Sequence, residues 1–119
     1  MSAPTLEHIA KFGNRRMVRD TYVVVKDNRI TCADGFSLSV IAGYGTYCSP
    51  RPGDDDGVAE DYSGPYTLVE VGYPSQRPEP WLGRWSERCD APGEPTSSVY
   101  GYVPGEWVRD LIESHGGEA

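Results

Sequence analysis

The sequence predicts one small domain that is mostly β, an antiparallel β-sandwich decorated with short helices, and three observations lead to this prediction. The chain has 119 residues, which suffice for a single domain. Glycine (14 residues) and proline (10 residues) are frequent, which favours short strands and turns over long helices. In addition, apolar and polar residues alternate on both sides of an Asp-Gly pair, which is a strong hairpin signal.

The clearest predicted element is this hairpin, whose turn lies at Asp34 and Gly35. A type I′ turn needs positive φ at both central residues, which aspartate tolerates and glycine adopts freely, so we predict that turn here. A slip of one residue would move the whole apolar set into water, which fixes the register. The residues predicted to face the core are therefore Phe36, Leu38, Val40 and Ala42.

The segments before and after the hairpin are less regular. Residues 1–13 predict an accessory N-terminal helix or arm, with a frayed tail as the alternative. Residues 21–26 are β-branched and aromatic, so they predict a strand in a β-rich core over 20–103. Residues 52–64 form an acidic loop, whose consecutive aspartates do not match the alternating ligands of a calcium loop. We therefore expect this loop to be solvated and to hold no metal.

Two further strands and a terminal helix complete the prediction. The strands cover 66–73 and 98–103, and helical turns over 77–89 dock Trp81 and Trp85 on the sheet. Strict alternation in the last strand puts Tyr100 and Tyr102 on one face and Val103 on the other. The C-terminal helix covers 104–116, and its apolar stripe comprises Trp107, Val108, Leu111 and Ile112.

Charge and cysteine content exclude several classes of protein. The net charge of −7 argues against a protein that binds polymeric DNA or RNA. Basic residues nevertheless outnumber acidic ones over 11–29, where they either hold a small anion or balance the acidic loop. Three cysteines give neither a disulfide framework nor a zinc pattern, and no segment predicts a signal peptide or membrane span. We therefore expect a cytoplasmic protein with reduced thiols.

The sequence carries no catalytic signature. It lacks phosphate-loop, dinucleotide-binding and metalloprotease motifs, and its two histidines, His8 and His115, are interpreted as surface residues. Binding without catalysis is therefore the favoured interpretation, with no cofactor and no metal. A small hydrolase or cyclase acting on a nucleotide is the enzymatic alternative.

Four sequence blocks, over residues 30–40, 47–51, 64–74 and 98–117, together resemble the first family of Thoeris anti-defence proteins of bacteriophages. The resemblance covers about half of the chain. It implies an immunoglobulin-like β-sandwich with a C-terminal helical element, and a homo-oligomer whose ligand pockets lie at subunit boundaries. It also implies a sponge in the host bacterial cytoplasm, which binds cyclic ADP-ribose isomers, and in some members cyclic oligonucleotides, without cleaving them.

Under this resemblance, the two blocks over 47–51 and 98–117 supply the ligand-binding residues. Arginine binds phosphate in bidentate fashion and tyrosine stacks on adenine, while a hydroxyl adds a polar contact. The predicted ligand-binding residues are Tyr47, Ser49, Arg51, Tyr100 and Arg109.

Simpler structural roles remain open for each of these residues. The block over 47–51 also fits an ordinary strand exit, and either Tyr100 or Tyr102 packs under the C-terminal helix in that interpretation. Arg109 has Glu106 and Glu113 as possible partners on its own helix.

The alternative function is that of a module that binds and inhibits a host enzyme. The acidic residues over 54–61 would then imitate a nucleic-acid surface. Exposed tryptophans would anchor the partner protein, and the candidates are Trp81, Trp85 and Trp107.

Overall fold

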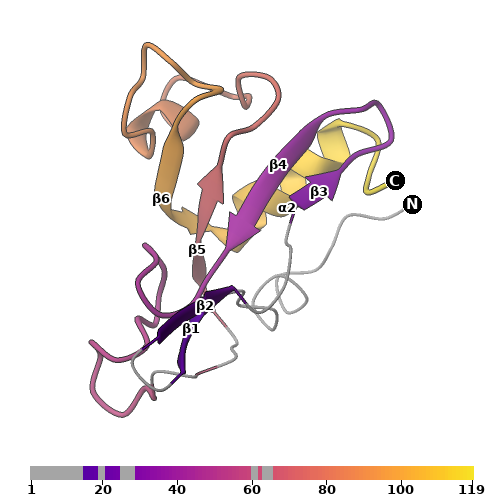
Figure 1. Ribbon diagram of the computed structural model, residues 1–119. Coiled ribbons are helices and arrows are strands. Elements are labelled where there is room, and N and C mark those ends of the chain that lie inside the picture. The colour runs from indigo at the N-terminus through magenta and orange to yellow at the C-terminus, as the bar shows by residue number, and fades with distance from the viewer. Residues whose placement is uncertain (1–14, 19–20, 25–28, 60–61, 63–65) are drawn as a thin grey trace.

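The computed structural model describes residues 15–18, 21–24, 29–59, 62 and 66–119 (Figure 1). The predicted arm over 1–13 lies outside these residues. The described elements in chain order are β1 (Arg15–Val18), β2 (Thr21–Val24), β3 (Arg29–Thr31), β4 (Ser37–Ile41), β5 (Leu68–Gly72), the 3₁₀ turn η1 (Trp85–Glu87), β6 (Val99–Pro104) and α2 (Gly105–Ser114). The strand β1 has no counterpart in the prediction.

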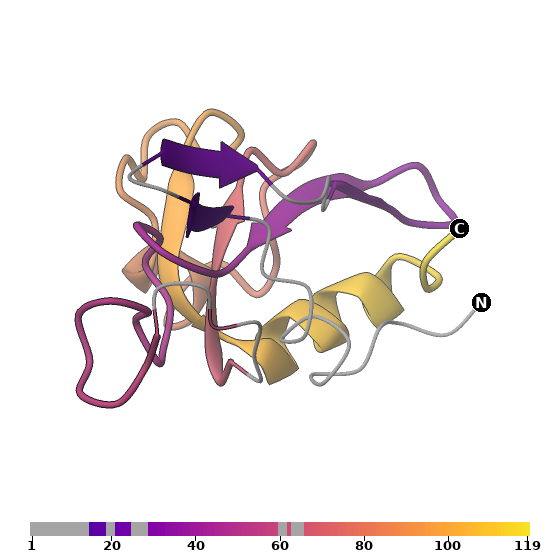
Figure 2. The same ribbon diagram turned by 60° about the horizontal axis from the view of Figure 1, so that its bottom comes forward.

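The strands form two antiparallel sheets. The larger sheet has the order β3-β4-β5-β6, and the smaller one pairs β1 with β2. Helix α2 runs along one side of the larger sheet, and Figure 2 shows β1 and β2 on the other side. The prediction of a mostly β protein with a C-terminal helix is confirmed. None of the described helices is long and apolar enough to cross a membrane.

The central hairpin is confirmed, although its turn differs from the predicted one. The four predicted core residues are at most 2% exposed, and Ile30 pairs with Leu38 in the ladder. Only Gly35 has positive φ (94°), and it donates to the Cys32 carbonyl at 3.0 Å. Cys32 in turn donates to the Phe36 carbonyl at 2.7 Å, which closes a three-residue loop. A type I turn followed by a left-handed glycine explains this geometry, so the predicted type I′ turn was wrong.

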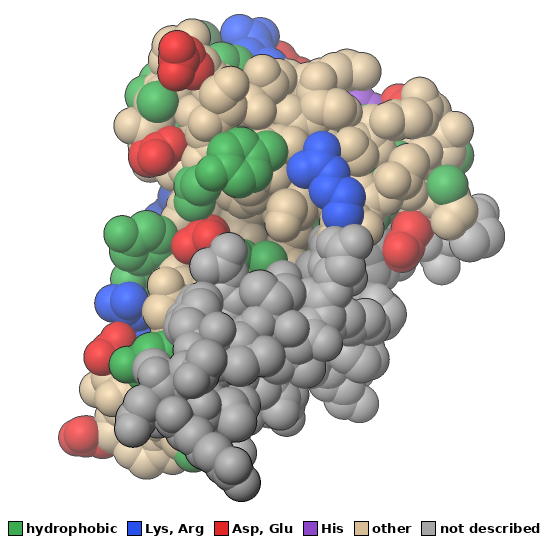
Figure 3. Space-filling view, viewed as in Figure 1, with side chains coloured by type: hydrophobic (Ala, Val, Ile, Leu, Met, Phe, Trp, Pro, Cys, Tyr) green, Lys and Arg blue, Asp and Glu red, His purple; other side chains and the backbone are tan. Residues whose placement is uncertain are grey.

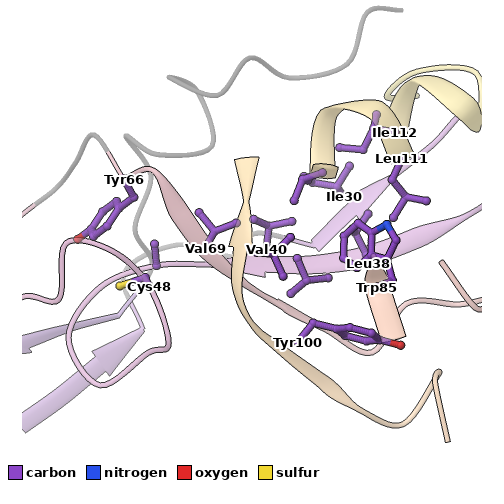
Figure 4. Packing of buried hydrophobic residues seen from close by; sticks show 14 of the residues in the cluster. Ile30, Leu38, Val40, Cys48, Tyr66, Val69, Trp85, Tyr100, Leu111 and Ile112 are labelled. Carbon is purple, nitrogen blue, oxygen red and sulfur yellow. The ribbon is translucent and has the colours of Figure 1, made fainter. Parts of the chain in front are cut away.

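One hydrophobic core lies between the larger sheet and α2, and Figure 4 shows residues of β3, β4 and β5 converging on the helix. Val108, Leu111 and Ile112 of α2 are at most 1% exposed, which confirms most of the predicted stripe. Burial of several aliphatic side chains at about 25 cal/mol per Å² of apolar surface is what holds the helix on the sheet.

The tryptophans belong to this core and do not form exposed anchors. Trp85 is fully buried, and Trp81 and Trp107 are half-buried and pack against the cluster. The turns over 77–89 therefore dock two tryptophans on the core as predicted. The premise of the alternative function, that the tryptophans are exposed, is wrong.

The last strand departs from the predicted alternation. Val69 pairs with Val103 and Val71 pairs with Tyr100, so β6 holds one more residue than β5 over this stretch. Such a β-bulge shifts the phase of the side chains. Tyr100 and Val103 are consequently both fully buried. The prediction that Tyr100 and Tyr102 share one face, with Val103 on the other, was wrong for this reason.

The C-terminus folds back on the hairpin turn. Gly116 and Gly117 follow α2 with φ of 89° and 87°, and Gly117 accepts a hydrogen bond from Ala33 at 2.8 Å. His115 stacks flat on Phe36 with ring centroids 4.0 Å apart. Its Nδ1 lies 2.6 Å from the carboxylate of Asp34. His115 is therefore an ordered part of this junction, and the prediction of a simple surface residue was wrong.

A groove on the open face of the sheet

The candidate site is a groove of about 790 Å³ on the face of the larger sheet opposite the core. Side chains alternate along a strand, so the neighbours of the buried residues in β4, β5 and β6 point to this side. Figure 3 shows this side of the molecule, where hydrophobic, basic and acidic side chains stand among backbone and other side chains. The volume falls in the range of small-molecule sites. The lining residues are Ser39, Ile41, Tyr47, Glu70, Gly72, Tyr73, Glu87, Arg88, Asp90, Val99, Gly101 and Tyr102.

Small residues on three neighbouring strands make the floor of this groove. Ser39 of β4 pairs with Gly72 of β5, and Gly101 lies on β6. A Cβ atom on Gly72 would meet only the Ser39 Cβ, at an ordinary 3.8 Å. A Cβ atom on Gly101 would come within 3.1 Å of the Tyr47 Cβ, so Tyr47 packs directly over this glycine. The floor is therefore open at Gly72, whereas the Tyr47 side chain covers it at Gly101.

Tyrosines form the walls. The rings of Tyr47 and Tyr102 have centroids 5.8 Å apart and are tilted by 46°. Tyr47 is 52% exposed and Tyr73 is 55% exposed, so both offer ring surface to a ligand. Ring faces of this kind stack on nucleobases.

Two of the wall tyrosines have a strained backbone. Tyr73 and Tyr102 have φ of 49° and 51°, and they are the only non-glycine residues with positive φ in the part of the chain that the structure describes. Positive φ is uncommon for a bulky residue and costs on the order of 1–3 kcal/mol. Such strain gathers at functional sites, and here both instances line the same groove.

Three acidic residues, Glu70, Glu87 and Asp90, and one basic residue, Arg88, are among the described residues that line the groove. Glu70 accepts a hydrogen bond from the Tyr47 backbone N–H at 3.1 Å, and Asp90 accepts one from the Val99 N–H at 3.0 Å. These bonds fix two of the acidic groups in place. The Arg88 guanidinium lies 5.4 Å from the Trp107 ring centroid. Trp107 belongs to α2, so the guanidinium of Arg88 is placed by its contact with the helix.

The structure places part of the predicted site at this groove. Tyr47 lines it, and the Arg51 guanidinium lies 5.8 Å from the Tyr47 ring centroid. Arg51 is partly neutralised by Asp54, whose carboxylate oxygen lies 3.6 Å from Nε. Ser49 belongs to the same loop, but its backbone pairs with Leu68 and its side chain is not part of the lining.

The other two predicted residues lie elsewhere. Tyr100 is fully buried between Trp81 and Trp85, and its hydroxyl donates to the Pro95 carbonyl at 2.7 Å. Burial also raises the pKa of this phenol. A ring with no exposed face cannot stack on a ligand unless the core opens, so Tyr102 takes its place in the groove.

Arg109 lies on α2, at the side of the sheet that carries the core, and it is not among the residues that line the groove. It makes no ion pair with Glu106 or Glu113, and the helix instead pairs Asp110 with Arg84 at 3.5 Å. Sequence reasoning missed Tyr102, Tyr73, Glu70 and Arg88 as lining residues. The only signal in the sequence was that Tyr102 and Glu70 fall within strands and alternate with apolar neighbours.

A second cluster of polar groups lies at the hairpin turn. Asp34 accepts hydrogen bonds from the Phe36 N–H at 2.9 Å and from His115. The Phe36 N–H first, and His115 second, lower the pKa of this carboxyl group. The nearby Cys32 is 1% exposed, and its burial raises the pKa of the thiol, so it lacks the thiolate character of a nucleophile. This cluster is a structural junction.

Neither a metal site nor a known relative indicates what the groove binds. Within the described ranges, no three His, Cys, Asp or Glu residues come together as metal ligands. Comparisons of the chain with protein-family models, with curated proteins and with solved structures found no match.

Proposed function

We propose that this protein binds a cyclic nucleotide signal, of the cyclic ADP-ribose type, in the groove on the open face of the sheet, and holds it without cleaving it. The observation that carries the proposal is the pair of strained tyrosines, Tyr73 and Tyr102, beside a floor of small residues. Together with Tyr47 they present ring surface around a volume suited to one small molecule.

Each part of such a ligand finds a matching group. Adenine stacks on the exposed side of the Tyr47 or Tyr102 ring, above the floor at Gly72. Ribose hydroxyls donate to a carboxylate such as Glu70, which is the usual acceptor for sugar hydroxyls. The pyrophosphate pairs with the guanidinium of Arg51, which lies beside Tyr47.

The resemblance to the Thoeris anti-defence family supports the same proposal from the sequence. It extends the proposal to an immunoglobulin-like fold and to a homo-oligomer. It also places the activity in the cytoplasm of a bacterium infected by a phage.

Retention of intact ligand tests the proposal. The full chain is incubated with a cyclic ADP-ribose isomer, filtered to remove unbound ligand and heat-denatured, and the released material is identified by chromatography and mass spectrometry. Intact ligand in the released fraction is expected. Absence of retention refutes the proposed binding, and release of linear products instead favours a hydrolase.

The substitution Gly72→Val locates the binding site. The new side chain extends from the floor into the groove, where only the Ser39 Cβ lies nearby, so the strand is expected to tolerate it. Retention is expected to fall at least tenfold with an unchanged melting temperature. Gly93→Val is the matched control, because it adds the same atoms in open space away from the groove. Equal retention by both variants would place the ligand elsewhere.

A further inference from the structure

Arg29 of β3 reaches across the open face of the larger sheet to a wall of the groove. In the ladder Arg29 lies opposite Ser39, and Ser39 lies opposite Gly72, so these three residues form one row across β3, β4 and β5. Residues that lie directly opposite each other in an antiparallel pair point to the same face of the sheet. Because Ser39 and Gly72 are small, the long side chain of Arg29 has room to cross β4 toward Tyr73, which follows Gly72.

The Arg29 guanidinium makes two hydrogen bonds at the end of this row. Its Nη1 donates to the Tyr73 carbonyl at 2.8 Å, and its Nη2 donates to the Ser37 hydroxyl at 2.8 Å. Ser37 is also bound twice to Ser75, since its N–H donates to the Ser75 hydroxyl at 2.9 Å and its carbonyl accepts from the Ser75 N–H at 2.8 Å. The planar guanidinium fork and the two serines therefore tie the segment after β5 to β3 and β4.

These bonds hold Tyr73 in a conformation that it does not favour. Its φ of 49° is uncommon for a bulky residue, and the residue before a proline, here Pro74, prefers an extended backbone with negative φ. The Tyr73 N–H donates to the Ser98 carbonyl at 3.0 Å, and the guanidinium fixes the Tyr73 carbonyl. Without the guanidinium, Tyr73 is expected to relax toward the extended conformation, which takes its exposed ring away from the groove.

We infer that Arg29 is a positioning residue for the groove, whose guanidinium keeps the Tyr73 ring in place as a wall for the ligand. Arg29 is not among the residues that line the groove, so it acts through Tyr73. Hydrogen bonds from a charged donor are stronger than neutral ones, which lets the guanidinium offset the backbone strain at Tyr73. The inference rests on the proposed function, because Tyr73 is a wall of the proposed nucleotide site.

Arg29→Lys tests the inference without changing the net charge. An ammonium group lacks the planar fork that spans the Tyr73 carbonyl and the Ser37 hydroxyl, so the carbonyl is expected to be released. Positive φ brings the amide proton and the Hα of the same residue close together, which gives a strong nuclear Overhauser effect between them. In NMR spectra of the full chain this signal is expected to weaken about threefold at Tyr73 and to persist at Tyr102, whose φ is also positive.

Retention of a cyclic ADP-ribose isomer connects the position of Tyr73 to binding. Retention is expected to fall about tenfold in Arg29→Lys, as for the loss of one stacked ring. Ser37→Ala removes the acceptor of the second guanidinium bond but keeps Arg29, and it is expected to lower the Tyr73 signal and the retention together. Arg77→Lys is the matched control, because Arg77 is an exposed arginine that pairs with Glu79 outside the groove, and both readouts are expected to stay unchanged.

The two readouts together decide the outcome. An unchanged Tyr73 signal in both Arg29→Lys and Ser37→Ala overturns the inference, and so does a weakened signal with unchanged retention. Reduced retention with an unchanged Tyr73 signal also overturns it, because Arg29 then contacts the ligand itself. If Arg29→Lys loses the Tyr102 signal as well, the fold is disturbed and Ser37→Ala decides. A wild-type chain that retains no cyclic ligand refutes the proposed function, whereas the NMR signal still shows whether Arg29 positions Tyr73.

Discussion

Removal of the Tyr100 hydroxyl is expected to destabilise the protein by a predictable amount. In Tyr100→Phe the Pro95 carbonyl loses a 2.7 Å hydrogen bond in a site where the ring is fully buried. A buried hydrogen bond of this kind contributes about 1–2 kcal/mol, once the acceptor left unpaired is included. A chain of 119 residues unfolds with an entropy of about 0.25 kcal/mol/K. The melting temperature is therefore expected to fall by about 4–8 °C.

Thermal unfolding followed by circular dichroism measures this shift. Tyr47→Phe is the matched control, because Tyr47 is 52% exposed and lines the groove. Its melting temperature is expected to change by less than about 2 °C. If Tyr100→Phe melts at the wild-type temperature, the hydroxyl makes no buried hydrogen bond and the packing described for β6 is wrong.

The pH dependence of the same pair of proteins gives an independent check. Burial first, and then Cys89 and Asp90, raise the pKa of Tyr100 above its ordinary value. A raised pKa in the folded state means that the contribution of the neutral phenol is fully present below the unfolded pKa, near 10, and is lost as the pH rises toward the folded pKa. The stability difference between wild type and Tyr100→Phe is expected to be constant at neutral pH and to shrink above about pH 10. If the stability difference between the two proteins grows above about pH 10, the pKa of Tyr100 is not raised in the folded state.

Two further predictions concern the hairpin turn. Gly35→Ala is expected to lower the free energy of unfolding by about 1–2 kcal/mol, because φ is 94° there, although nothing obstructs the added methyl group. Gly93→Ala is the control, because it also adds a methyl group in open space but at a residue without positive φ. It is expected to leave the free energy of unfolding unchanged in chemical denaturation. Asp34→Asn is expected to weaken the loss of unfolding free energy at acidic pH. The lowered pKa of Asp34 in the folded state stabilises the protein above the unfolded pKa, near 4, and this contribution is lost as the pH falls further. If the unfolding free energy of Asp34→Asn depends on acidic pH as that of wild type does, the Asp34 carboxylate contributes nothing through its hydrogen bonds to Phe36 and His115.

The sequence was sufficient where a local pattern decides the structure. Period-two alternation around Asp34 and Gly35 predicted the hairpin, since burial of one face leaves a single register. Apolar spacing likewise predicted helix α2, because Val108, Leu111 and Ile112 share a stripe that only the sheet can cover. The turn type was missed because Ala33 and Asp34 of the loop donate hydrogen bonds to the carbonyls of Gly117 and His115, which the local pattern does not contain.

The groove was predicted only in part, because its walls depend on contacts between segments far apart in the sequence. Tyr47 was identified from its loop, but nothing near it indicates that its side chain packs over Gly101. Arg88 and Glu70 are ordinary charged residues in the sequence, and only the fold places them on one face. Arg109 was assigned to the site from its residue type, and the helix carries it to the side of the core.

The irregularity in β6 links the stability of the core to the shape of the groove. In a regular strand Tyr102 would follow Tyr100 into the core and Val103 would point outward. The extra residue and the positive φ of Tyr102 exchange these places, so Val103 fills the core and Tyr102 becomes a groove wall. The Tyr102 N–H, which a regular ladder would direct to β5, donates instead to the Tyr47 carbonyl at 3.0 Å and joins two of the wall tyrosines. Because burial of Val103 offsets the backbone strain at Tyr102, the core itself holds this wall of the groove in its strained form.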